Sequence, residues 1–328
     1  MRKRDERVSA VEVRSCADVV SRMKKEISKI VIGQEEVVDG LICAILCDGH
    51  VLIEGVPGIA KTLLIRALAD VSGCSSKRVQ FTVDLLPTDL SGITSYTPGK
   101  GFEIIKGPIF TNFIIADEIN RSPPKTQSAL LEAMQEKQVT IGKTTFKLPI
   151  PFFVMANENP LEQSGVYPLP EAQVDRFLFK LIMTYPKIDD EEKIMEDNIT
   201  LSKFEDFCIK GVTSPAEILK MQSLTKRVYS SKKIKSYILK IVDITRAKDF
   251  EHGSCIAWGA SPRATIGLYI ASKARALMNG RNFVIPKDVR DVAYSVLRHR
   301  LMLTYKAKVG GISSDNIVSG ILSKLRAP

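Results

Sequence analysis

The chain has 328 residues, 45% of them hydrophobic and 26% charged, with a net charge of +10, a composition typical of a soluble globular protein with one large domain or two smaller ones. No stretch approaches the roughly 20 uninterrupted apolar residues of a membrane helix, and no apolar segment follows the charged start MRKRDERVSAVEVRS, so we expect neither a membrane span nor a secretory signal. The six cysteines lack C-x-x-C spacing and are interpreted as reduced packing residues of a cytoplasmic protein.

Helices and strands alternate in the first part of the chain. Apolar residues recur at helical spacing over 17–30, 35–46 and 61–70. Short apolar runs predict strands at 50–55, 78–83, 112–117, 152–157 and 179–183. Because strands that alternate with helices form parallel sheets covered on both faces, we expect an α/β domain of that kind.

Two insertions interrupt this alternation. Residues 86–111 are rich in Gly, Pro and Thr and show little helical periodicity. In 138–149, apolar and polar residues alternate on both sides of Gly142–Lys143. This second pattern predicts a β-hairpin.

Helical patterns dominate from about residue 190 onward. They cover 214–229, 235–250, 261–278 and 286–303. Two of them open with Ser-Pro, which suits a helix cap followed by a proline in the first turn. We therefore expect an α/β domain with an N-terminal helix over 1–188 and a smaller all-α lid domain over 189–328.

The positive charge is unevenly distributed. Residues 1–185 carry 22 basic and 22 acidic side chains, so the second part holds the whole excess. A basic half is typical of a protein with a nucleic-acid or acidic partner. It is also typical of a solvated helical surface with Lys and Arg outward, which is the interpretation we favour.

The segment GVPGIAKT at 55–62 matches the phosphate-binding pattern G-x-x-x-x-G-K-[ST], except that Ala60 replaces the second glycine. A predicted strand precedes it and a predicted helix follows, as the pattern requires. Backbone N–H groups and the helix N-terminus of such a loop face phosphates, while Lys61 reaches the outer ones and Thr62 holds Mg²⁺. Glycine is needed only where φ is positive or a side chain would strike the ligand, and Gly58 suits that condition better than Ala60. We therefore expect a working nucleotide loop.

Polar side chains also end two other predicted strands. The strand at 112–117 ends in Asp117, and Glu118 follows, at the edge of a parallel sheet where ligands bind. Asp117 is suited to the Mg²⁺ shell, and Glu118 to orienting or deprotonating the attacking water. ANENP at 156–160 supplies an amide for the γ-phosphate or the water, unless it is an ordinary Asx turn before Pro160.

Two arginines are candidates for anion contacts. Arg176 lies in a short amphipathic helix before the last predicted strand, and an arginine there can stabilise transition-state charge, often from a neighbouring subunit. The alternative is a surface salt bridge with Asp175 or Glu171. Arg263 lies in the first turn of a helix, where the helix dipole favours anions, which suggests an external anion as its partner.

Together these segments closely resemble the AAA+ ATPases, and within them the MoxR family, over nearly the whole chain. The matching segments are VIGQ (31–34), GVPGIAKT, DLLPTDLSG, GPIFTNFIIADEINRSPPKTQSALLEAMQE, PFFVMANENP, GVYPLPEAQVDRF and GASPRA. The GPIFTNF and EINRSPPKTQSALLEAMQE parts are the specific ones, because many AAA+ proteins share the rest. This family commonly carries alanine before the loop lysine, as this chain does.

The resemblance implies an ATPase that uses ATP and Mg²⁺, and it implies roles for the matching residues. The implied nucleotide-binding residues are Ile32, Gly33, Gly55, Val56, Pro57, Gly58, Ile59, Ala60, Lys61, Thr62, Leu63 and Arg263. The implied catalytic residues are Glu118, the first sensor Asn159, the arginine finger Arg176 and the second sensor Arg263, and the implied metal ligands are Thr62 and Asp117. The family usually has ATQNP where this chain has ANENP, so Asn157 competes with Asn159 as the sensor, and Glu158 adds a negative charge beside the phosphate site.

The resemblance also implies a chaperone-like remodelling or maturation factor for a client protein. Such proteins form hexameric rings and frequently work with partners that bear a von Willebrand factor A domain; segments 86–111 and 138–149 match their helix-2 insert and pre-sensor hairpin, which face the axial side of the ring. A nucleic-acid motor is the alternative, but the hairpin at 138–149 offers only Lys143 and Lys147 without interleaved aromatic residues, so nucleic acid is not the expected partner. A nucleotide-gated switch with negligible turnover is a third possibility, against which Glu118 and Arg176 argue.

Overall fold

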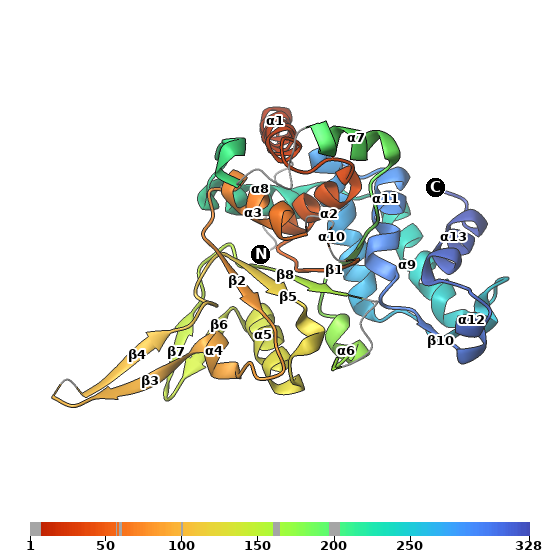
Figure 1. Ribbon diagram of the computed structural model, residues 1–328. Helices are drawn as coiled ribbons and strands as arrows, with labels where there is room; N and C mark the ends of the chain where they lie inside the picture. The colour runs from red at the N-terminus through yellow and green to blue at the C-terminus, as the bar shows by residue number, and fades with distance from the viewer. Residues whose placement is uncertain (1–7, 57, 59–60, 100, 160–164, 197–203) are drawn as a thin grey trace, which may run out of the picture.

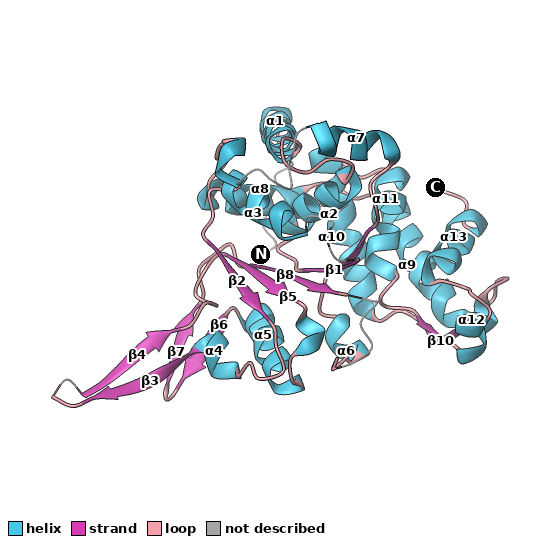
Figure 2. Cartoon of the chain, in the orientation of Figure 1, coloured by secondary structure: helices cyan, strands magenta, loops and turns pink. Residues whose placement is uncertain are grey.

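The computed structural model describes residues 8–56, 58, 61–99, 101–159, 165–196 and 204–328. A five-stranded sheet lies between helices, two hairpins project from one side, and further helices lie on the other side (Figures 1 and 2). The first part contains α1 (Ala10–Ile27), α2 (Glu35–Leu46), β1 (Val51–Gly55), α3 (Lys61–Val71), β2 (Ser76–Gln80), α4 (Pro87–Ser91), β3 (Gly92–Thr97), β4 (Gly101–Lys106), β5 (Phe113–Asp117), α5 (Pro124–Glu136), β6 (Gln138–Ile141), β7 (Thr144–Lys147), β8 (Phe153–Glu158), α6 (Glu171–Val174) and β9 (Phe179–Met183). The second part contains α7 (Ile188–Glu196), α8 (Pro215–Arg227), α9 (Lys232–Ala247), β10 (Ile256–Trp258), α10 (Pro262–Met278), α11 (Pro286–Leu297), β11 (Met302–Leu303), α12 (Tyr305–Val309) and α13 (Ser314–Lys324).

The central sheet is parallel throughout, with strand order β2-β5-β8-β1-β9. This confirms the predicted parallel sheet flanked by helices. One strand is shifted: β2 ends at Gln80 rather than at residue 83, because Gln80 pairs with Asp117, the last residue of its neighbour β5. The carboxyl ends of β5, β8 and β1 therefore meet at one edge of the sheet.

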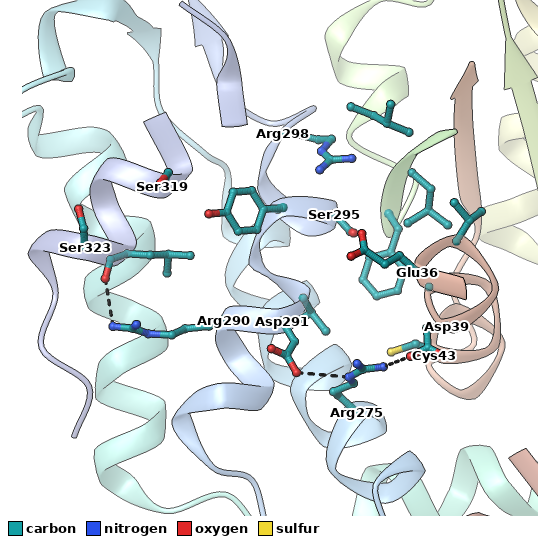
Figure 3. Close-up of a pocket in the computed structure, with 18 residues that line it drawn as sticks. Glu36, Asp39, Cys43, Arg275, Arg290, Asp291, Ser295, Arg298, Ser319 and Ser323 are labelled. Carbon is teal, nitrogen blue, oxygen red and sulfur yellow. Dashed lines mark hydrogen bonds and ion pairs between the residues drawn. The ribbon is translucent and has the colours of Figure 1, made fainter. Parts of the chain in front are cut away.

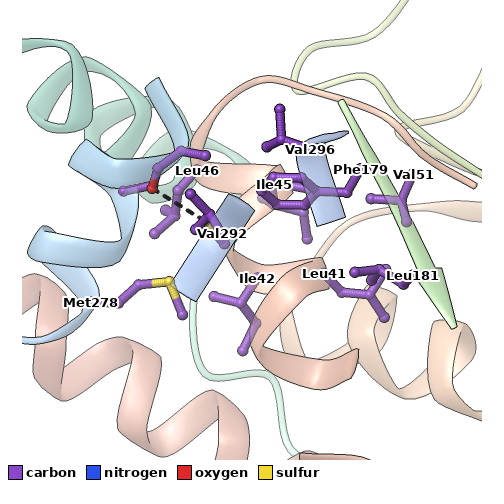
Figure 4. Packing of buried hydrophobic residues seen from close by; sticks show 14 of the residues in the cluster. Leu41, Ile42, Ile45, Leu46, Val51, Phe179, Leu181, Met278, Val292 and Val296 are labelled. Atoms are coloured by element: carbon purple, nitrogen blue, oxygen red, sulfur yellow. Dashed lines mark hydrogen bonds between the residues drawn. The ribbon is translucent and has the colours of Figure 1, made fainter. Parts of the chain in front are cut away.

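Alternate residues of each strand enter two separate cores. On β1, Val51 and Ile53 join the cluster that includes α1, α2 and α3, whereas Leu52 joins the cluster that includes α5. This alternation follows from the twofold side-chain period of a strand. The first cluster also includes residues of α8, α9, α10, α11 and α13, and Figure 4 shows side chains of α2, β9, α10 and α11 together in it. The second part of the chain therefore shares its core with the first.

The two insertions are both antiparallel hairpins. The predicted hairpin is confirmed as β6–β7, where Gly142 has φ +61 at the first position of a two-residue turn. The segment 86–111 contains α4 and the hairpin β3–β4, which the sequence did not predict. The hairpin buries neither face, since Ile93 and Phe102 are 46% and 80% exposed, so it lacks the apolar–polar alternation from which strands are predicted.

The second part is mainly but not purely helical. The helix predicted over 286–303 ends at Leu297, and the chain then forms β11, which pairs with β10 in a short antiparallel ladder. The side chains of residues 298–300 end the helix, because they contact carbonyl groups of β9 and of the segment before it. The boundary predicted at 188/189 falls at the start of α7. Among the described helices, none is long and apolar enough to span a bilayer.

A buried histidine joins three elements at the start of β1. The ring of His50 accepts a hydrogen bond at Nδ1 from the backbone N of Val154 at 3.0 Å, and its Nε2 lies 3.1 Å from the carbonyl O of Met134. The ring is therefore neutral, with the proton on Nε2. Burial lowers the pKa of His50 from 6.5 to about 4, because a charged ring would lose its solvation and its bond from Val154.

We expect His50 to make the fold less stable in acid. Between pH 6.5 and pH 4 the unfolded chain binds a proton that the folded ring does not, so stability falls as the pH falls, by about 2 kcal/mol between pH 7 and pH 5 from this group. Thermal unfolding of the wild type and of His50→Gln at both pH values measures the effect, since the glutamine amide can replace both bonds without titrating. An unchanged pH dependence in His50→Gln would contradict the assignment.

Candidate functional site

The predicted phosphate loop joins β1 to α3. Gly58 has φ +83, and a Cβ there would meet no atom within 4 Å, so the expectation that this glycine takes the positive-φ position is confirmed. Lys61 opens α3, and its Nζ donates to the carbonyl O of Gly55 at 2.5 Å. Thr62 and Leu63 follow in the same first turn, where free helix N–H groups favour anions. Pro57, Ile59 and Ala60 lie outside the described residues.

Asp117 is buried at the end of β5 and has two partners. Arg78 of β2 donates from Nε to Oδ2 at 2.5 Å, and Asn157 of β8 donates from Nδ2 to Oδ1. Asp117 is 4% exposed, and a buried carboxylate requires such partners. Three neighbouring strands therefore place polar side chains around one carboxylate beside the phosphate loop.

Glu118 has a left-handed backbone, with φ +55 and ψ +51. A non-glycine residue in this region is strained, and such strain is concentrated at functional sites. Its backbone N donates to Asn157 Oδ1 at 2.8 Å, and its Oε2 accepts from Gln80 Nε2 at 2.7 Å and lies 3.1 Å from Arg121 Nε. The carboxylate of Glu118 is thus held toward β2 by Gln80 and Arg121.

The VIGQ stretch lies at the same edge of the sheet. Gln34 donates from Nε2 to the carbonyl O of Thr184 at 2.9 Å, directly after β9. Gly33 has φ +74, and a Cβ there would lie 2.9 Å from Asp190 Oδ2 of α7. Ile32 and Gly33 are half-buried, between the phosphate-loop side of the sheet and the first helix of the second part.

The oxygen atoms at this edge suit a magnesium ion. Mg²⁺ favours carboxylate and hydroxyl oxygens and keeps several waters. Asp117 offers a carboxylate and Thr62 a hydroxyl. The described residues contain no group of three or more His, Cys, Asp or Glu side chains that could hold a metal by itself. A metal at this edge would therefore take its remaining ligands from water and a phosphate.

The two candidate sensor residues differ in their surroundings. Asn157 bridges Asp117 and the backbone of Glu118 with both ends of its amide. Asn159 follows β8 by one residue and is 8% exposed, at the edge where the strands end. Asn157 therefore organises the two acidic residues, while Asn159 lies just beyond the carboxyl end of β8.

Glu158 faces a lysine instead of the phosphate loop. Lys180 of β9 forms ion pairs with Glu54 of β1 and, at 3.5 Å, with Oε1 of Glu158 on β8. Burial raises the pKa of Glu158, against the attraction of Lys180. Three adjacent strands thus share one cation and two carboxylates, so Lys180 partly offsets the extra negative charge of Glu158.

Arg176 and Arg263 lie at the opposite edge of the sheet. The segment before β9 is next to the start of β1, where Leu178 N donates to the carbonyl O of His50 at 2.8 Å. Arg263 Nη1 is 3.6 Å from Asp175 Oδ2 in that segment. The five residues of β1, roughly 16 Å at 3.3 Å each, separate this edge from Gly55. Both arginines are therefore remote from the phosphate loop of their own chain.

The salt bridge considered for Arg176 does not form within the described residues. Asp175 pairs with Arg300 and Arg263 instead, and Arg176 Nε is buried without a hydrogen-bond partner. Arg263 does have a carboxylate partner, but at 3.6 Å and with 47% of its side chain exposed. Both guanidinium groups thus retain donors for an anion.

A cavity of about 690 Å³ lies away from this chemistry, between α2, β9, α11 and α13. It contains none of the predicted site residues. Its charges are paired across it: Arg275 contacts Asp39 at 2.5 Å and Asp291 at 3.5 Å, and Arg290 donates to the carbonyl O of Leu322 at 3.1 Å (Figure 3). The Arg275–Asp39 pair joins the second part of the chain to α2.

Sequence reasoning missed the residues that hold the predicted ones in place. Arg78 and Gln80 lie two apart on β2 and contact Asp117 and Glu118. Their i, i+2 spacing on a strand beside the acidic pair was an available signal. Arg300 contacts a segment 125 residues earlier, and no local pattern reports such a contact.

The chain matches two family models. The model described as "ATPase family associated with various cellular activities (AAA)" matches residues 50–179. The model described as "AAA lid domain" matches residues 250–321. The first match contains the phosphate loop, Asp117, Glu118 and Arg176, and the second contains Arg263.

Individual relatives cover nearly the whole chain. It is 43% identical to Chaperone MoxR1 of Mycobacterium tuberculosis over 309 residues, 92% of this chain and 81% of that protein. It is 28% identical to Protein MoxR of Methylorubrum extorquens over 333 residues, 95% of this chain and 96% of that protein. The solved structure of a Cytophaga hutchinsonii protein, provisionally described as an ATPase, superposes with a TM-score of 0.89 at 43% identity and covers 96% of this chain and 97% of its own.

Removing the charge of Glu158 should not affect the phosphate site. We expect Glu158→Gln to keep kcat and KM for ATP within about threefold of the wild type, because its carboxylate faces Lys180. Since its raised pKa means that the ionised form costs stability in the fold, the melting temperature should be unchanged or higher. Lys180→Met should lower it, because two carboxylates would then lack their cation. A large loss of turnover in Glu158→Gln would refute this assignment.

Proposed function

This chain belongs to the MoxR family of AAA+ ATPases and is itself an ATPase, and we propose that it acts as a ring-forming remodelling factor for a client protein. In this proposal each nucleotide lies between two copies of the chain. One copy supplies the phosphate loop, and its neighbour supplies Arg176 and Arg263. The relative named as a chaperone supports the chaperone-like role.

The placement of the charged residues at opposite sheet edges carries this proposal. Lys61, Asp117 and Glu118 follow the carboxyl ends of their strands, whereas Arg176 precedes β9. A single copy cannot bring both sets to one phosphate. Head-to-tail contacts between identical copies complete the site, and contacts of this type close into rings. A hexamer is the ring that the family resemblance favours.

Within the site, the chain's own residues act by position and charge. Lys61 leaves the carbonyl of Gly55 to contact the outer phosphates, and the first turn of α3 offers its free N–H groups. Thr62 and Asp117 would hold Mg²⁺, and the ion would supply positive charge to stabilise the phosphate oxygens. Glu118 leaves Gln80 and Arg121 to orient or deprotonate the attacking water, and Asn159 contacts the γ-phosphate or that water.

The projecting hairpins supply the surface for the client. The rings of Tyr96 and Phe102 on β3–β4 lie 5.2 Å apart between centroids in a tilted contact, and the residues are 62% and 80% exposed. Exposed aromatic side chains on a projecting element are typical of binding surfaces. We propose that these residues contact the client, and that a partner with a von Willebrand factor A domain assists, as the family resemblance implies.

Glu118→Gln should separate nucleotide binding from hydrolysis. We expect it to bind ATP with wild-type affinity while turnover falls by about 100-fold or more, because a general base typically contributes at least that much. Phosphate release and nucleotide binding measure the two effects, with Glu158→Gln as the matched control at the same sheet edge.

A protein that co-purifies with Glu118→Gln only in the presence of ATP would identify the client or partner. Stimulation of wild-type turnover by DNA or RNA would favour the nucleic-acid motor instead.

Mixing two inactive variants tests the shared site. Lys61→Ala should abolish nucleotide binding in its own copy, and Arg176→Ala should abolish hydrolysis at its neighbour. Rings co-expressed from both variants should recover about a quarter of wild-type turnover, because half of the sites and half of the fingers are intact. Each variant expressed alone is the control. Mixed rings that stay inactive would refute the proposal that the site is shared.

A further inference from the structure

Arg300 is a buried arginine that clamps the segment carrying Arg176. Its side chain is 3% exposed. Nε donates to Asp175 Oδ1 at 2.8 Å, Nη2 to the carbonyl O of Asp175 at 3.1 Å and of Phe177 at 2.6 Å, and Nη1 to the carbonyl O of Leu178 at 3.0 Å. The guanidinium fork thus fixes the backbone on both sides of Arg176.

Asp175 joins this clamp to a second point of the lid. Its carboxylate accepts from Ser261 Oγ, at 3.2 Å to Oδ1 and 3.0 Å to Oδ2, and Arg263 Nη1 lies 3.6 Å from Oδ2. Ser261 caps α10, the helix whose first turn contains Arg263. One carboxylate therefore connects Arg300, the start of α10 and the residue next to Arg176.

Arg176 itself has little else to set its position. No ion pair joins its side chain to another described residue, and its Nε has no hydrogen-bond partner. Its backbone N donates to the carbonyl O of Gln173 at 3.1 Å. The direction of its side chain consequently depends on the backbone that Arg300 holds.

We propose that the Asp175–Arg300 pair is a positioning device through which the lid sets Arg176 and Arg263 as one unit toward a neighbouring copy's nucleotide. This inference rests on the shared site proposed above. Arg300 acts through Arg176, since its side chain is 3% exposed and donates to protein oxygens on both sides of that residue. A lid displaced from Asp175 releases both arginines together, so the pair links lid position to hydrolysis at the next site.

Arg300→Lys tests the clamp with little change in charge. Lysine keeps a cation beside Asp175 but cannot donate to three carbonyls from a rigid fork. We expect turnover to fall by about 100-fold, as for a misplaced catalytic group, with ATP affinity within about twofold of the wild type. Arg298→Lys is the matched control: Arg298 pairs with Asp315 and contacts Lys180, outside 175–178, and should keep wild-type turnover. Wild-type turnover in Arg300→Lys would overturn the proposal.

Mixed rings then show which half of the site fails. Rings of Arg300→Lys with Lys61→Ala should recover about a quarter of wild-type turnover. Rings of Arg300→Lys with Arg176→Ala should recover none, because no copy in them presents a correctly placed Arg176 to its neighbour. A merely misfolded Arg300→Lys would rescue neither. Suppose that rings of Arg300→Lys with Lys61→Ala stay inactive while rings of Arg176→Ala with Lys61→Ala recover turnover. That result would overturn the positioning role alone. Failure of that reference pair would overturn the shared site, and the positioning role with it.

A double variant tests whether the two residues act through one contact. Asp175→Asn should lower turnover, and Asp175→Asn combined with Arg300→Lys should lower it little beyond the more damaging single change. If the fold-losses of turnover of the two single variants multiply in the double variant, Asp175 and Arg300 act independently, which would contradict the proposal.

Discussion

The common direction of the five central strands determines where chemistry can occur in this chain. Strands β5, β8 and β1 all end at one edge of the sheet. Strand direction alone therefore brings together Asp117, Asn157 and the phosphate loop. The same rule sends the segment before β9 to the other edge, with Arg176 on it. Asp175 then brings Arg263 to that edge as well. In the shared site that we propose, each copy therefore contributes one edge to each of two sites.

The charged residues Asp117, Glu118 and Lys61 at the carboxyl edge each have partners within the chain. Asp117 is paired with Arg78 and Asn157, Glu118 with Gln80 and Arg121, and Lys61 with the carbonyl of Gly55. Buried charges without partners are costly, so a ligand must replace these contacts as it binds. Replacing them moves side chains on β2, β5 and α3 together. Binding and release of nucleotide therefore change contacts beyond the loop. A ligand shifts a conformational equilibrium only when it interacts differently with the two conformations, and these contacts supply such a difference.

The sequence predicted those features whose signal is local. The parallel sheet, the β6–β7 hairpin and the position of Gly58 follow from apolar runs, from a two-residue turn and from the φ of a tight loop. The β3–β4 hairpin escaped because both of its faces are exposed, so no burial pattern marks its strands. The helix over 286–303 was predicted too long, because its end depends on contacts of residues 298–300 with β9 and the segment before it. Glu158 looked like an unexplained charge beside the phosphates until Lys180, on a strand two places away in the sheet, gave it a partner.

The extent of the shared core bears on which parts move during hydrolysis. Val292 and Val296 of α11 and Met278 of α10 are buried in one cluster with Ile42 of α2 and Phe179 of β9 (Figure 4). Full burial of each such side chain contributes about 1.5–3 kcal/mol. A large rotation of the lid against the sheet would expose several of them, and the free energy lost would exceed what one paired contact such as Asp175–Arg300 contributes. Small displacements at the start of α10 leave that core intact, yet they shift Ser261 and Arg263 relative to Asp175. In the proposed ring, the larger movement therefore belongs between copies, where the arginine edge of one chain would meet the phosphate loop of the next.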